Sequence, residues 1–590
     1  MPRKKPYSVK QKKEQLKKKR QHSDKQQETR FKHGGTKSTV LQEPSDSDSE
    51  DSTLASSLAK LHLSHKPRRD TAQTLTGKQY DPDRYKLFFQ TETNEEIEER
   101  KQQARRPIVY LSKLELEYTI EDIYKPGTVL DMPKRPKWNY KMDKRQVEAN
   151  EESMFRHYIR DIKHEHPGTE LSYFEMNLET WRQLWRVLEV SNIVVIITDV
   201  RYPIIHFSPT LYTHAREDLK KDVILVLNKI DLVPPEVVVA WKDYFHKKFP
   251  DLHIICFTSF PKDPEEIRQM EIKVKKRLRR RKKRSFIPVG PRELHHVCEK
   301  LMHGKVNLKD WLHHIEDQEK NTDEGVTYEE TLSSDENEDD GSMFEEVEKK
   351  EGILTIGLVG HPNVGKSSLL NGLIGRKVVS CSRTPGHTKH FQTIFLTPSV
   401  RLCDSPGLVF PSLVNRRLQI LSGTYPIAQV REPYSVVGYL AACTPLEKVL
   451  KLVHPKVAQA KEDGEDVPED LEWSAWDICD AWAEQRGFHT AKAGRPDTYR
   501  AANSLLRLAT DGKIVMCLYP PQFTSKQETW KAHSETKDIA KLQQQFSDLK
   551  QWRLEEATRE AESNSSEHEQ TGSEEDVHVC NAFSLLEQDD

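Results

Sequence analysis

The sequence predicts an α/β fold built around a phosphate-binding loop. Residues 360–367 read G-H-P-N-V-G-K-S, which fits the pattern G-x-x-x-x-G-K-[ST]. The apolar run 353–359 predicts a strand before this loop, and residues 368–374 predict a helix after it. Helical stretches alternate with further strand-like runs, which is typical of a parallel sheet covered by helices. These other runs are residues 222–227, 254–257 and 400–403.

The residue types in this loop suit a bound polyphosphate. Gly360 and Gly365 allow a tight backbone turn whose N–H groups point at a β-phosphate. The next helix adds its positive N-terminal end. Lys366 would bridge the β- and γ-phosphates, and the Ser367 hydroxyl would bind Mg²⁺. The expected phosphate-side residues are Gly360, Asn363, Val364, Gly365, Lys366, Ser367 and Ser368.

A second phosphate-side element follows the strand-like run 400–403. Its sequence is D-S-P-G, so Asp404 would lie at a strand end and hold Mg²⁺ through water. The N–H of Gly407 would meet the γ-phosphate. Between the two elements, residues 383–389 read R-T-P-G-H-T-K. One threonine of this stretch, either Thr384 or Thr388, is expected to complete the Mg²⁺ shell.

A base-reading motif lies earlier in the chain. Residues 228–231 read N-K-I-D after a strand-like run, as in the guanine-reading element of GTPases. Asp231 can accept from both N1–H and the 2-amino group of guanine, whereas adenine would leave buried polar groups unpaired. Asn228 would brace the loop and Lys229 would pack its stem over the base. Thr258 and Ser259 close another strand and complete the expected guanine pocket.

Together these motifs resemble the circularly permuted GTPases of ribosome assembly, the YlqF/YawG family. In most GTPases the phosphate loop precedes N-K-x-D, whereas here it follows. Residues 199–203, D-V-R-Y-P, are similar to the family signature D-A-R-x-P, with Val200 in place of alanine. Residues 258–260, T-S-F, are similar to S-A-[KL], although Phe260 departs from it. The resemblance covers about residues 175–412 and continues more weakly through the C-terminal region.

This resemblance implies an α/β P-loop GTPase domain with circularly permuted motif order, a helical C-terminal region and disordered charged tails. It implies GTP and GDP as ligands with Mg²⁺, and it favours Thr388 over Thr384 because P-G-x-T is the family form. Leu408 stands where most GTPases have a glutamine that orients water, so slow hydrolysis is expected. The catalytic residues would be Lys366 and Asn363, the latter with K⁺. For Asn363 a purely structural role in the turn is the alternative.

The chain is expected to comprise five regions. Within the second, residues 132–138 suggest an ordered strap, and apolar spacing predicts helices around 147–162 and 181–188. A helical patch is expected at 294–314, and Trp473, Trp476, Trp482 and Phe488 are expected to fill a C-terminal core. The regions are a disordered basic, then acidic arm (1–80), a mixed region (81–174), the G domain (175–412, with a charged insertion at about 262–350), a helical region (413–550) and an acidic tail (551–590).

Charge is segregated along the 590 residues, although the net charge is only −2 (91 − 93). Residues 1–33 carry thirteen Lys or Arg against three Asp or Glu, and residues 273–284 carry ten cations in twelve positions. Such blocks predict contacts with the phosphates of ribosomal RNA or a pre-ribosomal particle. Recognition by nuclear import factors, or a solubilising role, is the alternative. Acidic, serine-containing stretches at 45–51, 333–340 and 555–590 are candidate phosphorylation sites.

These features predict a nucleotide-dependent switch in ribosome biogenesis, located in the nucleus or nucleolus, with shuttling to the cytoplasm left open. The alternative is a GTP-stabilised nuclear scaffold or adaptor without useful turnover. No apolar run reaches the about 18 residues that span a membrane, and no signal peptide is evident. The eight cysteines are scattered, which predicts neither a disulfide framework nor a zinc site. Residues 295–298, H-H-V-C, are the nearest approach to a metal cluster.

Overall fold

The computed structural model describes residues 93–166, 171–259, 288–323, 352–380, 391–463, 471–490 and 494–543. The chain divides into the units Met1–Gln79 and Tyr80–Asp590, and every described residue belongs to the second. The basic segments 1–33 and 273–284, the acidic serine-containing stretches and the acidic tail lie outside the described residues. No helix in the described ranges is long and apolar enough to cross a membrane.

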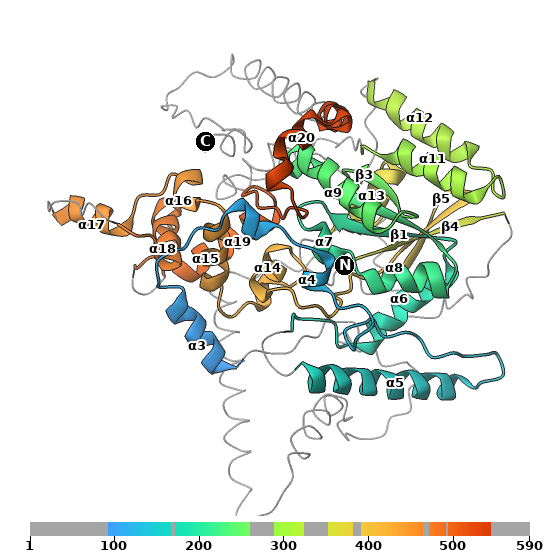
Figure 1. Ribbon diagram of the computed structural model, residues 1–590, viewed down its shortest axis with the longest axis horizontal. Helices are drawn as coiled ribbons and strands as arrows, with labels where there is room; N and C mark the ends of the chain where they lie inside the picture. Colours follow the sequence, from blue (N-terminus) through green and yellow to red (C-terminus); the bar gives the residue numbers. More distant parts are fainter. Residues whose placement is uncertain are drawn as a thin grey trace, which may run out of the picture. The chain divides into compact units, whose positions relative to one another are not determined.

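A six-stranded sheet forms the centre of the second unit (Figure 1), with the order β3-β2-β1-β4-β6-β5. Strands β3, β2, β1, β4 and β6 are parallel, and β5 pairs antiparallel with β6 at the edge. The inner strands are apolar and buried on both faces, as expected of a covered parallel sheet. The strands are β1 (Ile193–Asp199), β2 (Asp222–Asn228), β3 (His253–Phe257), β4 (Leu354–Val359), β5 (Gln392–Thr397) and β6 (Val400–Asp404).

Alternate residues of each strand feed two apolar cores. In β1, Val194 and Ile196 belong to one core, whereas Ile193, Val195 and Ile197 belong to the other. The second core is covered by α11 (Pro291–Met302), α12 (Lys309–Asp323) and α13 (Lys366–Ile374). The first and larger core is covered by helices preceding and following β1 and β2. Those elements are α6 (Leu178–Val190), α7 (Pro203–His206), α8 (Pro209–Thr213), a π-helical turn η2 (His214–Asp218), η3 (Ile230–Leu232) and α9 (Pro235–Lys248).

The residues before the sheet extend the larger core. Helix α6 begins where the Asn177 side chain accepts from the N–H of Glu179, and its apolar face buries Trp181 and Trp185. Residues 132–138 have no helix or strand and form the expected strap beside α6. Trp185 Nε1, in α6, donates to the carbonyl of Pro133 at 2.9 Å and holds the strap against the helix. The helices of this part are α3 (Asn94–Gln103), η1 (Lys113–Leu116), α4 (Ile120–Ile123) and α5 (Lys144–Glu165).

The residues after the sheet are mainly helical and join the same core (Figure 1). Helices α15, α18 and α19 pack together. The elements are α14 (Arg416–Leu421), η4 (Ile427–Gln429), α15 (Tyr434–Cys443), α16 (Leu446–Val449), α17 (Pro455–Asp463), α18 (Ala475–Arg486), α19 (Thr498–Thr510), η5 (Thr524–Lys526), α20 (Gln527–Ala532) and a final described helix over 534–543.

The structure confirms the expected strands and the helices around 147–162, 181–188 and 368–374, and each of these three helices is longer than its sequence signal. The expected helical patch at 294–314 is confirmed and consists of two helices, α11 and α12. In the C-terminal region Trp482 is buried, but Trp473, Trp476 and Phe488 are only partly buried at the edge of the core. The expected five regions remain a prediction, because one continuous core joins three of them.

Candidate nucleotide-binding site

The candidate site lies at the carboxyl ends of β1, β2, β4 and β6. From β1 the chain proceeds outward to β2 and β3, whereas from β4 it reaches β6 and β5 on the other side. The neighbours β1 and β4 therefore mark the point where the strand order reverses, and ligands of open α/β sheets bind in the crevice outside this point. The phosphate loop follows β4, the base-reading motif follows β2, and Asp404 ends β6.

The two glycines of the phosphate loop are required by close approaches. Gly360 has φ +147°, and a Cβ there would lie 2.5 Å from the carbonyl oxygen of Ile197 in β1. Gly365 has φ +106°, and its Cβ would lie 2.3 Å from Nδ2 of Asn228. Residues other than glycine rarely adopt such backbone angles. The loop is therefore held tightly against both β1 and the base-reading motif.

Lys366 and Ser367 begin helix α13 behind the loop. The ammonium of Lys366 is buried and donates to the carbonyls of Gly360 and His361 at 3.0 and 2.6 Å. Burial lowers the pKa of Lys366 to about 8, although the charge of Asp404 opposes this shift. The amine therefore lies beneath the phosphate loop at the N-terminal end of α13, where a bound anion would neutralise its charge.

Ser367, in the first turn of α13, and Asp404, at the end of β6, are brought together. The Ser367 hydroxyl donates to Oδ2 of Asp404 at 2.7 Å, and burial raises the pKa of this carboxyl. The other oxygen, Oδ1, is buried without a hydrogen-bond partner in the part of the chain that the structure describes. A hydroxyl beside an unsatisfied carboxylate fits Mg²⁺, which prefers oxygen ligands and would polarise a phosphate. The third expected ligand, Thr384 or Thr388, lies outside the described residues.

The segment after Asp404 contacts the phosphate loop through its backbone. A Cβ on Gly407 would lie 2.7 Å from Cα of Pro362, and the N–H of Leu408 donates to the carbonyl of Gly360 at 3.3 Å. The side chain of Leu408 is 1% exposed and belongs to the larger core. This position therefore supplies packing, and it has no polar atom that could orient water.

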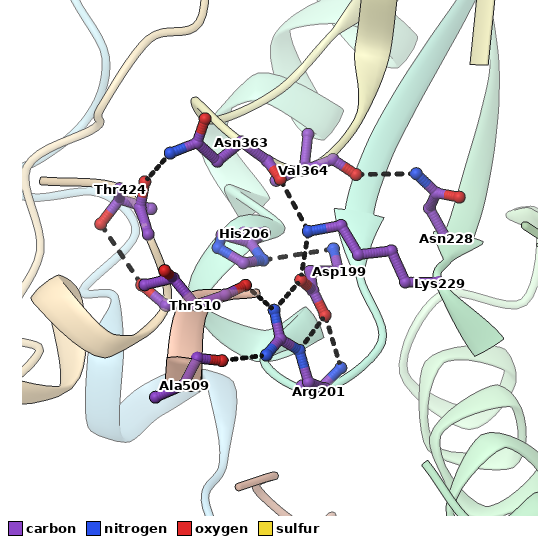
Figure 2. A network of polar contacts seen from close by, with 12 residues as sticks. Asp199, Arg201, His206, Asn228, Lys229, Asn363, Val364, Thr424, Ala509 and Thr510 are labelled. Atoms are coloured by element: carbon purple, nitrogen blue, oxygen red, sulfur yellow. Dashed lines mark hydrogen bonds and ion pairs between the residues drawn. The ribbon is translucent and has the colours of Figure 1, made fainter. Parts of the chain in front are cut away.

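Figure 2 shows the base-reading motif bonded to the phosphate loop. Asn228 Nδ2 donates to the carbonyl of Val364 at 2.8 Å, and Lys229 Nζ donates to that of Asn363 at 2.7 Å. The hydrogen bond to Val364 is the contact through which Asn228 would brace the loop. Two motifs more than a hundred residues apart in the chain are therefore held as one unit.

The strand β3 end supports the base-reading motif from the other side. The hydroxyl of Thr258 donates to Oδ1 of Asp231 at 2.7 Å, and that of Ser259 lies 3.5 Å from Oδ1 of Asn228. Thr258 therefore fixes the orientation of the carboxylate expected to read guanine. Phe260, the departure from the family pattern, lies outside the described residues.

Asn363 has the geometry of a turn residue in this structure. Its φ is +59°, which asparagine tolerates better than most residues, and its Nδ2 donates to the carbonyl of Gly423 at 2.9 Å. The bond joins the phosphate loop to the segment after α14. This hydrogen bond supports the structural role of Asn363 in the turn. A bound K⁺ would instead contact the side-chain oxygen of Asn363.

The sequence motif H-H-V-C has a packing role. His295 lies against Trp311, and its Nε2 is 3.1 Å from the carbonyl of Leu308, while Cys298 is buried in the smaller core. The described residues contain no group of three potential metal ligands of the His, Cys, Asp or Glu types.

Sequence reasoning missed the role of Arg201. It recognised the D-x-R-x-P signature but assigned no partners to the arginine. In the structure Arg201 binds Asp199 through both Nε and Nη2, at 3.0 and 2.8 Å, and also reaches the carbonyls of Ala509 and Thr510 (Figure 2). A buried arginine needs a partner, but backbone carbonyls about 300 residues away give no sequence signal.

Known proteins match the phosphate side of the site and most of the chain. The family model "50S ribosome-binding GTPase" matches residues 355–450. Guanine nucleotide-binding protein-like 1 of Homo sapiens is 46% identical over 92% of this chain and 90% of its own length, and that of Mus musculus is 46% identical over 91% and 89%. The chain belongs to the family of guanine nucleotide-binding protein-like 1. The GTPase family relationship expected from the sequence and the expected α/β GTPase fold are thereby confirmed.

Two more distant matches are a yeast protein and a solved structure. Large subunit GTPase 1 of Saccharomyces cerevisiae is 34% identical to this family member over 66% of the chain and 58% of the yeast protein. The GNP-bound YlqF structure from T. maritima is 17% identical, covers 58% of this chain and 97% of its own, and has a TM-score of 0.31.

Proposed function

We propose that this protein binds GTP and GDP and acts as a slow GTPase switch in ribosome biogenesis. The observation that carries the proposal is the joining of the phosphate loop to the base-reading motif through Asn228 and Lys229, at 2.8 and 2.7 Å. In this arrangement the loop that would hold the polyphosphate lies beside Asp231, the carboxylate that would select guanine. Family membership and the GTPase family model support the same reading.

Each expected residue receives a role from its position. Gly360, Val364, Gly365 and Ser368 would offer backbone N–H groups to the phosphates, and Lys366 would neutralise them. Ser367 and Asp404, with Thr388, would hold Mg²⁺, and the N–H of Gly407 would meet the γ-phosphate. On the base side Asp231 would read guanine while Thr258 orients it. Asn228, Lys229 and Ser259 would keep that loop against the phosphates.

Hydrolysis by the purified protein should be slow and should depend on potassium. Leu408 has no polar group to orient water, so Leu408→Ala should change the single-turnover rate less than about twofold. If K⁺ assists through Asn363, replacing potassium with sodium should slow hydrolysis, and Asn363→Ala should remove that ion dependence. The measurement is phosphate release from GTP in matched potassium and sodium buffers.

The control for this prediction is Asn503→Ala, a partly buried asparagine in α19 whose side chain donates to the carbonyl of Tyr499 in the same helix. It should retain the ion effect of the unchanged protein. Fast hydrolysis that is equal in sodium and potassium would refute the proposed assistance and indicate another catalytic group.

The ribosomal assignment is supported by the yeast relative, whose name places it with the large subunit, and by the basic segments. Residues 1–33 and 273–284 carry enough positive charge to bind RNA phosphates in a salt-sensitive way. Such segments would also serve as nuclear or nucleolar addresses, and phosphorylation of the acidic stretches would weaken or redirect their contacts.

Co-sedimentation with pre-ribosomal particles tests the switch. More protein should travel with the particles in a non-hydrolysable GTP analogue than in GDP. Deleting residues 1–33 and neutralising 273–284 should reduce co-sedimentation several-fold at moderate salt. Equal co-sedimentation in both nucleotides would favour a nucleotide-stabilised scaffold over a switch. No co-sedimentation under any condition would refute the ribosomal role.

A further inference from the structure

The C-terminal segment 498–543 contacts the base-reading loop, residues 228–233, directly at two places, and it is connected to the loop at a third place through Arg201 and Asp199. The first contact is made by Gln543, in the last described helix. Its Nε2 donates to the carbonyls of Ile230 and Val233, at 2.7 and 2.9 Å. One amide nitrogen therefore satisfies two backbone oxygens on either side of Asp231 and Leu232. These two hydrogen bonds to the backbone fix the loop around Asp231, the residue expected to read the base.

The second contact is the turn that follows α19. Gly512 has φ +67°, and a Cβ at this position would lie 2.8 and 3.0 Å from the two methyl carbons of Leu232. Leu232 is the residue directly after Asp231, and it is buried. The turn and the leucine therefore fit closely, and the loop has no room to move toward α19.

The third contact passes through a buried group of charges (Figure 2). Arg201 Nη1 donates to the carbonyl of Ala509 at 2.8 Å, and Nη2 donates to that of Thr510 at 3.2 Å. These carbonyls lie at the C-terminal end of α19, where a cation is favoured by the helix dipole. The same guanidinium holds Asp199, whose Oδ2 accepts from Lys229 Nζ at 2.7 Å.

This charged group is kept ionised by its own members. Burial alone would raise the pKa of Asp199, but the charges of Arg201 and Lys229 lower it well below its usual range. Asp199 and Arg201 are each 1% exposed. Because Lys229 also donates to the carbonyl of Asn363, the group connects the end of α19 with both the base-reading loop and the phosphate loop.

We propose that segment 498–543 is a retention clamp: it holds the base-reading loop in its guanine-binding conformation, with Gln543 and Arg201 as positioning residues. Displacing the segment would free the backbone on both sides of Asp231 and speed nucleotide release. Binding sites require their side chains to be held within about 0.5 Å of productive geometry, so small loop movements suffice. The inference rests on the proposed guanine binding and adds a built-in control of nucleotide exchange.

The contacts favour an effect on release over a general effect on folding. Gln543 is only partly buried and bonds the loop backbone, so its loss should leave the two cores intact. The contacts of Gln543 and Gly512 are made with Ile230, Leu232 and Val233, on the base side of the crevice. A ligand that has phosphates but no base should therefore be insensitive to Gln543.

The test measures release of a fluorescent GDP from the full-length protein after addition of excess GDP. Gln543→Ala should speed release about fivefold to tenfold, since it removes two ordinary hydrogen bonds. Gln543→Glu should speed it further, because a carboxylate would face two carbonyl oxygens. The ratio of GDP affinity to inorganic pyrophosphate affinity should fall in both variants, whereas a general loss of structure would lower both affinities together.

Gln485→Ala is the matched control, since this glutamine donates to the carbonyl of Leu450 in the same C-terminal region, away from the loop. It should release GDP at the rate of the unchanged protein. Arg201→Lys, which keeps a charge for Asp199 but lacks the fork that reaches α19, should also speed release. Release rates for the Gln543 variants equal to that of Gln485→Ala would overturn the clamp. Failure of the unchanged protein to bind GDP would refute the proposed function as well.

Discussion

Asp231→Asn should exchange the guanine preference of the site for xanthine. The carboxylate would accept from two guanine donors, whereas an amide can accept from only one while directing a donor at the other. GTP affinity should fall about 100-fold to 10,000-fold, because a hydrogen bond to a charged group contributes about 1.5–3 kcal/mol and two are affected. Xanthosine triphosphate has a carbonyl in place of the 2-amino group, so it should bind the variant better than GTP does. Competition against a fluorescent nucleotide measures both affinities.

The control is Asp243→Asn, in which an exposed carboxylate of α9 loses its ion pair with Lys247. This variant should keep the base preference of the unchanged protein. Thr258→Val should give an intermediate loss of GTP affinity, because it removes the 2.7 Å bond that orients Asp231 without changing the charge. If ATP displaced the fluorescent nucleotide from the unchanged protein as readily as GTP does, Asp231 would not be reading the base.

The sequence predicted four of the six strands, β2, β3, β4 and β6, and the polar residues at their ends, because both depend on local signals. The apolar run 353–359 and the glycines after it predict a strand followed by a tight turn, and β4 with its loop has that form. In the same way, Asn228 and Asp231 follow a buried strand and therefore reach the carboxyl edge of the sheet. A parallel sheet then brings those ends together regardless of the order of the motifs in the chain.

The contacts that cross the molecule could not be predicted in this way. Arg201 bonds to backbone carbonyls at 509 and 510, and backbone atoms carry no residue-specific signal. Gln543 lies in a polar helix whose sequence gives no reason to expect a bond to Ile230. Asn363 was expected at the phosphates, yet its amide is bonded to Gly423, a partner set by the packing of α14. Such contacts depend on the full three-dimensional arrangement, which local periodicity does not encode.

Lys366→Ala should nearly abolish nucleotide binding. The buried amine is the one charged side chain of the phosphate loop sequence 360–367, and a bound phosphate would be left without its cation. Losing one partner of a buried charge pair costs about 2–5 kcal/mol, so GDP affinity should fall about 30-fold to several thousand-fold. Lys377→Ala, at an exposed position just after α13, should leave the affinity unchanged. Isothermal titration with GDP measures both variants.

The same lysine should make GDP affinity depend on pH in a defined direction. Burial lowers the pKa of Lys366 from 10.5 to about 8, and a bound phosphate would raise it again. Below pH 8 the amine is already protonated, so affinity should be flat with respect to this group. Between pH 8 and the raised pKa of the complex, binding must take up a proton, and affinity should fall by up to about tenfold per pH unit. The slope should persist in Lys377→Ala and disappear in Lys366→Arg, whose guanidinium stays protonated. A flat profile from pH 7 to 10 in the unchanged protein would show that Lys366 is not the group that neutralises the phosphates.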